Sequence, residues 1–184
     1  MKNLFYIILL FLALYVHKIS IAQCDLPTNE QGNYEYVDVI NLDSAFSRVK
    51  IYNSALISMS SIFKSVNDVI EVKDENAGYI IGKFTTESTP FRLANCISYF
   101  RFSIRLDFKD SKYRIVINYL EHNAFSLSTS CSCPNPITSD KCDGGTCLYK
   151  YEWDKQRCEA HNEVIRAVEN LKDLILKNLT YTEW

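Results

Sequence analysis

The strongest constraint on the fold is a strict two-residue alternation in one segment of the chain. The apolar positions of this segment are Phe100, Phe102, Ile104, Leu106 and Phe108, and the polar ones are Arg101, Ser103, Arg105, Asp107 and Lys109. Because successive side chains of a β-strand point to opposite sides, one face of this strand must be buried and the other must be wet. Asp110-Ser111-Lys112 then turns the chain into a second strand, so the segment predicts a β-hairpin ending near Glu121.

Other periodic segments surround this hairpin. Residues 34–42 are rich in β-branched and aromatic side chains and predict a first strand. Residues 70–73 and 79–86 flank turn residues and predict another hairpin. The predicted sheet therefore consists mainly of antiparallel neighbours.

Two segments have helical periodicity. Ser47 can cap a helix in which Tyr52, Ala55, Leu56 and Met59 begin an apolar stripe that continues to Val66, with Asn53 and Ser54 on the polar side. A second amphipathic helix is predicted at about residues 155–179. The order β-α-β-β-β-β-α predicts an α+β domain of two layers, with both helices on one face of the sheet and the other face open.

Part of this pattern resembles a known family. Residues 36–84, with Gly78-Tyr79-Ile80-Ile81-Gly82-Lys83 at the third strand, and Lys109-Asp110-Ser111-Lys112-Tyr113-Arg114 at a later turn, resemble the domain of unknown function 4468, which has a TBP-like fold and occurs in exported bacterial proteins. The resemblance covers roughly residues 34–122. It implies a curved sheet backed by helices and brings no catalytic residues. Likeness to the architecture of the TATA-binding protein does not bring DNA binding with it.

The N-terminus has the three parts of an export signal. Lys2 precedes the apolar run Leu4–Val16, and Ser20-Ile21-Ala22 is a small-x-small pattern. The run is shorter than the about 20 residues that span a bilayer, so we expect a signal peptide at 1–22 rather than a retained transmembrane anchor. The mature product is then periplasmic or secreted. A lipoprotein anchored through Cys24 is the alternative, although Gln23 is larger than the residue that normally precedes a lipidated cysteine.

Composition indicates one domain at 23–184. After cleavage the chain keeps 18 basic and 22 acidic residues, a net charge of −4, so neither charge nor export favours a nucleic-acid partner. A cysteine-rich insertion at about 126–151 precedes the last helix. Six cysteines are expected in disulfides, which stabilise small exported segments: Cys96, Cys131, Cys133, Cys142, Cys147 and Cys158. Cys24 is then the odd thiol.

The alternative for these cysteines is zinc. Its ligands would be Cys142 and Cys147 with others from Cys131, Cys133, His122 and His161. The Cys-x-Cys spacing is tighter than usual zinc spacing, and export oxidises thiols. We therefore predict no metal and no cofactor.

No motif marks an active site. A catalytic nucleophile needs an adjacent base, and His122 and His161 both look like surface histidines. The sequence thus favours a non-enzymatic binding or envelope-accessory protein. The alternative is a hydrolase-type enzyme with a site between the cysteine-rich loop and the sheet.

The open sheet face is the predicted binding surface. Tyr34, Tyr36, Tyr99 and Tyr113 are expected on or near it together with Arg101, Arg105 and Arg114, and tyrosine and arginine are enriched in protein interfaces. Across the hairpin, Asn118, Val116 and Leu120 are expected to share it if the register is simple. We assign partner binding to Tyr99, Arg101, Arg105 and Arg114. The partner is an unknown envelope or extracellular protein, peptide or glycan.

Overall fold

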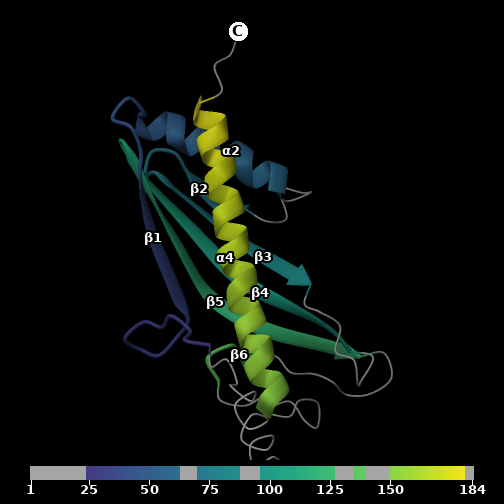
Figure 1. Cartoon of the computed structure of the whole chain (residues 1–184). Helices are drawn as coiled ribbons and strands as arrows, with labels where there is room; N and C mark the ends of the chain where they lie inside the picture. Colours follow the sequence, from purple (N-terminus) through teal and green to yellow (C-terminus); the bar gives the residue numbers. More distant parts are fainter. Residues whose placement is uncertain (1–23, 63–69, 88–95, 127–134, 140–149, 181–184) are drawn as a thin grey trace, which may run out of the picture.

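The computed structural model describes residues 24–62, 70–87, 96–126, 135–139 and 150–180. The elements are β1 (Glu35–Asn41), α2 (Arg48–Ile62), β2 (Ile70–Asp74), β3 (Tyr79–Glu87), β4 (Cys96–Lys109), β5 (Lys112–Ser126), β6 (Asn135–Pro136) and α4 (Lys150–Thr180). The sheet has the order β1-β5-β4-β3-β2, every pair is antiparallel, and β6 pairs with β5. Figure 1 shows α4 (yellow-green) running across one side of the sheet, with α2 (blue) crossing it near one end. The predicted two-layer α+β fold, with both helices on one side of an antiparallel sheet, is confirmed.

The core lies between the sheet and the two helices. The five apolar residues of the alternating strand β4 are all buried on the helix side, as predicted, and β5 adds Tyr113, Ile115 and Ile117. From α4 the apolar stripe Val164, Val168, Leu171 and Ile175 meets them. Burying each large aliphatic side chain contributes roughly 1.5–3 kcal/mol, so this layer supplies most of the driving force for folding.

The N-terminus of α2 ties the two hairpins together. Ser47 caps it as predicted: the Ser47 carbonyl accepts from Ile51 N at 3.0 Å and its hydroxyl accepts from Lys50 N at 3.4 Å. Asp110, in the β4–β5 turn, accepts from Arg48 N at 2.7 Å, and Arg48 Nη1 donates to the Asn76 carbonyl in the β2–β3 turn at 3.0 Å. The carboxylate of Asp110 also suits the positive end of the helix dipole.

Serines join α2 to α4, contrary to the prediction that Ser54 faces solvent. Ser54 is buried and its hydroxyl donates to the Ile175 carbonyl at 2.8 Å. Ser58 is also buried, and it accepts a hydrogen bond of 2.9 Å from Asn178. Small side chains let the two helices approach closely. Each hydroxyl has a hydrogen-bond partner, Ser58 also donating to the Ser54 carbonyl at 2.7 Å, so their burial costs little.

A β-bulge divides β5. Arg101 pairs with Glu121 and Ser103 with Asn118, so two residues of β5, Tyr119 and Leu120, stand opposite one residue of β4. Before the bulge the odd-numbered residues of β5 face the helix layer, and beyond it the even-numbered ones do, beginning with Leu120. Leu120 is therefore buried, and the prediction that it shares the open face is wrong.

Helix α4 begins earlier than predicted, and its first turn contacts part of the cysteine-rich insertion. Trp153 in its first turn is buried, and its indole N–H donates to the Ser139 carbonyl at 2.7 Å. Ile137 is fully buried and its N–H donates to the Leu120 carbonyl at 3.0 Å. This piece of the insertion therefore belongs to the main core.

The expected signal peptide, residues 1–22, and most of the cysteine-rich insertion lie outside the described residues. Within the described part of the chain, no helix is long and apolar enough to span a membrane. Neither Cys24 nor Cys158 is in a disulfide bond in the structure. The predicted disulfide-rich loop thus has no support in the structure.

Candidate functional site

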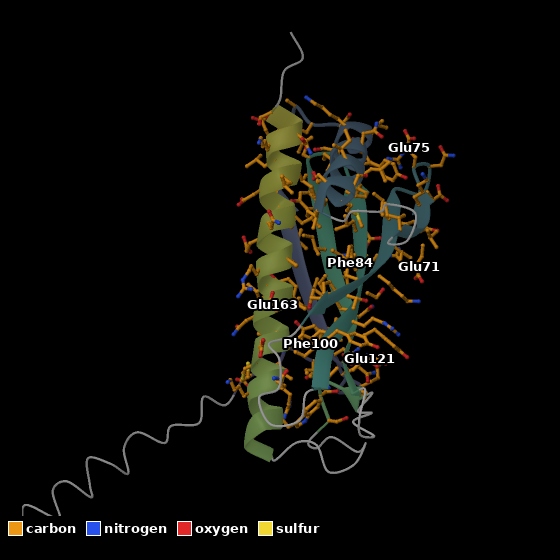
Figure 2. The ribbon with its side chains drawn as sticks, turned by 90° about the vertical axis from the view of Figure 1, so that its right-hand side faces the viewer. Glu71, Glu75, Phe84, Phe100, Glu121 and Glu163 are labelled. Carbon is orange, nitrogen blue, oxygen red and sulfur yellow. The ribbon has the colours of Figure 1, made fainter. Side chains whose placement is uncertain are left out.

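The side of the sheet remote from both helices is called the open face here. Cross-strand register places on it Val37, Val39, Arg114, Val116, Asn118, Tyr99, Arg101, Ser103, Arg105, Asp107, Tyr79, Ile81, Lys83, Thr85 and Val72. Figure 2 shows Glu163 on α4, and Glu71 and Glu121 on the opposite side of the molecule. Within the described residues, both helices lie on the other side of the sheet and none covers this face.

An aliphatic row crosses the open face through all five long strands. In register it runs Val37, Val116, Arg105, Ile81 and Val72, with a single arginine at its centre. Val37 is 49% exposed and Val72 43% exposed at the two edges, and Val39 on the same side of β1 is 51% exposed. Large apolar side chains gathered on a wet face are more informative than single exposed ones.

A charged group lies beside the aliphatic row. Asp107 accepts from Arg105 Nε at 2.7 Å and from Arg114 Nη2 at 2.7 Å, and the Arg105 guanidinium lies 5.0 Å from the centroid of the Tyr79 ring. Partial burial acts to raise the pKa of Asp107, but the hydrogen bonds from Arg114 and Arg105 outweigh it and hold the pKa below its usual range. Asp107 thus stays ionised at neutral pH and fixes both arginines at the centre of the face.

The two ends of the open face are hollowed. One recess, of about 420 Å³, lies at the bulge and is lined by Asn29, Asn33, Tyr34, Glu35, Asn118, Tyr119, Leu120, Glu121, Pro136 and Thr138. The other, of about 370 Å³, lies at the hairpin ends and is lined by Val39, Ala77, Gly78, Asp107, Phe108, Lys109, Lys112, Tyr113 and Arg114. Each is of a size that holds a few side chains of a partner.

Tyr119 is a strained residue at the rim of the first recess. Its φ is 63°, in the left-handed region, and its side chain is 69% exposed. A non-glycine residue there costs on the order of 1–2 kcal/mol and burial of its ring offsets none of it. Strain of this kind at an exposed aromatic residue points to a use for that side chain outside the fold.

The four residues assigned to partner binding lie together on the open face. Arg101, Arg105 and Arg114 are exposed and Tyr99 is partly buried, so the alternation located them correctly; their role in binding remains a prediction. The other tyrosines expected there do not lie on it. Tyr34 and Tyr113 are buried, and Tyr36 is on the helix side, where its hydroxyl lies 3.5 Å from Asp38.

Neither histidine is the surface residue that the sequence predicts. His122 is buried, with its ring centroid 5.7 Å from Phe100 and 5.4 Å from Trp153. His161 is half-buried and shares a 2.9 Å hydrogen bond between its Nδ1 and Tyr34 Oη. Burial lowers the pKa of His161 and raises that of Tyr34, so both are neutral at pH 7. Neither histidine ring lines either recess.

The predicted metal and disulfide residues are only partly described. Cys131, Cys133, Cys142 and Cys147 lie outside the described residues, and Cys96 is the first residue of β4. Among the residues that are described, no cluster of three His, Cys, Asp or Glu side chains could hold a metal. The six-cysteine assignment therefore stays a prediction.

Sequence reasoning missed two features of this surface. The exposed valines of β1 were not assigned to it, because their period-2 spacing shows that Val37 and Val39 share a face but not that this face is the open one. Tyr119 was missed because nothing in its neighbours indicates a bulge: left-handed bulge positions are usually marked by glycine, and here there is none.

Comparison with known proteins identifies the fold. The family model for the domain of unknown function (DUF4468) with TBP-like fold matches residues 36–123. A crystal structure of a TBP-like protein from Parabacteroides distasonis ATCC 8503 is similar with a TM-score of 0.63 at 13% identity, covering 82% of this chain and 97% of that one. A DUF4468 family protein from Bacteroides ovatus ATCC 8483 gives 0.56 at 12% identity, covering 85% and 91%. No curated protein matches by sequence.

Proposed function

Residues 36–123 belong to the family of domains of unknown function (DUF4468) with TBP-like fold, and on this premise we propose that the chain is a non-enzymatic binding protein that docks a protein partner on its open sheet face. The observation that carries the proposal is the aliphatic row with Arg105 at its centre. An arginine among exposed aliphatic side chains, flanked by tyrosine, is the composition of an interface core rather than of a plain solvated surface.

The chemistry of the row defines the partner. Val37, Val116 and Ile81 favour aliphatic side chains, because they offer apolar area and no hydrogen bonds. Arg101 is exposed. Arg105 and Arg114 both pair with the single carboxylate of Asp107, so two guanidinium groups face one negative charge. A partner surface with aliphatic residues and an additional carboxylate would complement both features, which favours a protein or peptide over a glycan.

The compartment is part of the proposal. The signal-like sequence at residues 1–22 supports export, so the partner is a component of the cell envelope or of the extracellular space. N-terminal sequencing of the protein recovered from cells tests this step separately. A mature chain that starts at Gln23 supports it, whereas an intact Met1 contradicts it.

Arg101→Ala and Arg105→Ala are expected to fold like the wild type and to weaken partner binding. Truncating a central arginine in a binding hot spot costs about 2 kcal/mol or more, which is roughly thirtyfold in affinity. The assay is affinity capture of the mature protein from its native envelope, followed by titration of the captured component against each variant. Arg166→Ala is the matched control, because Arg166 is exposed on α4, in the other layer.

The result that contradicts this assignment is a captured component that binds all three variants and the wild type equally. If Arg101→Ala and Arg105→Ala unfold instead, the arginines are structural. A captured component that competes with free sugars would point to a glycan as the ligand.

Tyr119→Gly is expected to change stability and binding in opposite directions. Glycine relieves the left-handed strain, so the free energy of unfolding should rise by up to about 1 kcal/mol, while binding weakens through loss of the exposed ring. Ser111→Gly is the control: Ser111 also has a positive φ, of 61°, but sits in the β4–β5 turn. It should gain stability with no loss of binding. Denaturant unfolding and the titration above measure the two effects. Unchanged binding by Tyr119→Gly would show that the bulge is not part of the docking surface.

A further inference from the structure

Two cysteines from distant parts of the chain meet at the start of α4's buried face. Cys24 precedes β1 and Cys158 lies in the third turn of α4, yet their side chains are hydrogen-bonded to each other. Both are partly buried. The contact joins segments that are separated by more than a hundred residues in sequence.

The surrounding backbone and side chains fix this contact. Residues 24–34 fold back along the start of β1: Thr28 bridges Tyr34, and Glu35 N donates to the Pro27 carbonyl at 3.0 Å. Tyr34 then reaches α4 through its 2.9 Å hydrogen bond with His161. Since Cys158 and His161 are three residues apart, they share one face of the helix, and Cys24 is brought to that same face.

We propose that Cys24 and Cys158 form a disulfide bond in the exported protein and so fasten the N-terminal segment to α4. Thiols in hydrogen-bond contact are close enough for a disulfide to form by small side-chain rotations. An oxidising compartment then makes the disulfide the expected state. This inference rests on the export proposed above, but not on partner binding at the open face.

The reaction is a thiol–disulfide exchange with a disulfide oxidant, either a protein disulfide or a small-molecule disulfide. One thiolate attacks the oxidant and forms a mixed disulfide, and the second thiol then displaces the oxidant's other sulfur. The two cysteines lose two electrons and two protons, and the oxidant is reduced to two thiols. Burial, together with the neighbouring Cys158, raises the pKa of the Cys24 thiol to about 12.

This pairing has two consequences for the sequence-based predictions. It gives a partner to Cys24, which was expected to be the odd thiol, and removes Cys158 from the cysteines available to the insertion. It also excludes a lipid on the Cys24 sulfur, so the chain would be released by its signal peptidase rather than anchored. Among the described residues, no third potential metal ligand lies beside the two cysteines, so we expect them to form a disulfide rather than bind a metal.

Peptide mapping without reduction tests the bond directly. The mature protein is isolated from cells, its free thiols are blocked with iodoacetamide in denaturant, and it is digested with trypsin. Cleavage after Arg48, Arg157 and Arg166 yields peptides 23–48 and 158–166, which contain Cys24 and Cys158 as their sole cysteines. We expect these two peptides to be found joined by one disulfide.

Three findings would overturn the proposal. These are alkylation of both cysteines, a disulfide from either peptide to one carrying Cys96, Cys131, Cys133, Cys142 or Cys147, and a lipid on the 23–48 peptide. Each is read from the mass of the same digest, whether or not any variant folds.

Thermal unfolding of serine variants provides a second test. Closing so long a loop restricts the unfolded chain strongly, so Cys24→Ser and Cys158→Ser should each lower Tm by on the order of 10 °C under non-reducing conditions. The double variant should lose no more than either single one, because one bond is removed in all three. Additive losses, or no loss at all, would contradict the bond.

Discussion

Val37→Lys is expected to leave the fold intact and to weaken partner binding by about a hundredfold or more. Val37 is 49% exposed on the edge strand β1, where a lysine is well tolerated in the free protein. In the complex that we propose, the same position is covered by apolar groups of the partner. Burying an ammonium group without a partner costs several kcal/mol, and about 2.7 kcal/mol already corresponds to a hundredfold loss.

Ile57→Lys is the matched control for this prediction. Ile57 is 58% exposed, but it lies on α2 in the other layer of the domain. Circular dichroism and thermal unfolding should show two folded variants of similar stability, and titration with the captured component should separate them. Equal binding by both variants would mean that the aliphatic row is not the docking surface. Weak binding by both would assign the loss to charge rather than to position.

The alternation of β4 was sufficient to predict the layer structure of the domain. Five apolar side chains at every second position can be buried together only if a second layer covers one side of the strand, and the amphipathic helices were the available cover. The same alternation placed Arg101 and Arg105 on the open face without any knowledge of the neighbouring strands. A strict period is therefore informative about the site as well as the fold.

The facing of β1 could not be read in the same way. Its hydrophobic pattern suggests that Val37 and Val39 are buried, but they are exposed, and Asp38 faces the helix layer. Asp38 is tolerated there because Lys172 of α4 pairs with it at 2.5 Å. Desolvation acts to lower the pKa of Lys172, but Asp38 and Glu169 outweigh it and keep the pKa raised. A partner more than a hundred residues away decides this orientation, and a local pattern does not contain it.

The bulge and the recesses also depend on tertiary packing between distant segments of the chain. One extra residue at Tyr119 inverts the rest of β5, which buries His122 and puts Glu121 on the open face. From the sequence alone, the simple register predicted the opposite for Leu120. The recess at this point also needs Asn29 and Asn33 from the turn before β1 and Pro136 from β6, two segments far apart in the sequence. Its existence follows from tertiary packing alone.

Trp153→Ala is expected to lower the free energy of unfolding by about 3–5 kcal/mol. The Trp153 side chain is fully buried beside His122, and it also anchors the insertion through its hydrogen bond to the Ser139 carbonyl. Truncation leaves a large cavity and an unpaired carbonyl, and it removes the contact that fixes residues 137–139. Chemical denaturation followed by tyrosine fluorescence and circular dichroism measures the loss.

Trp153→Phe separates packing from hydrogen bonding. Phenylalanine keeps most of the apolar volume but cannot donate to Ser139, so we expect it to lose less than half as much stability as alanine. Because Ile137 of the insertion is buried in the same core as Ile115 and Ile117, both variants should unfold in one cooperative transition. Two separate transitions, the first confined to the insertion, would show instead that the cysteine-rich segment is a satellite of the domain, held by its own cross-links rather than by Trp153.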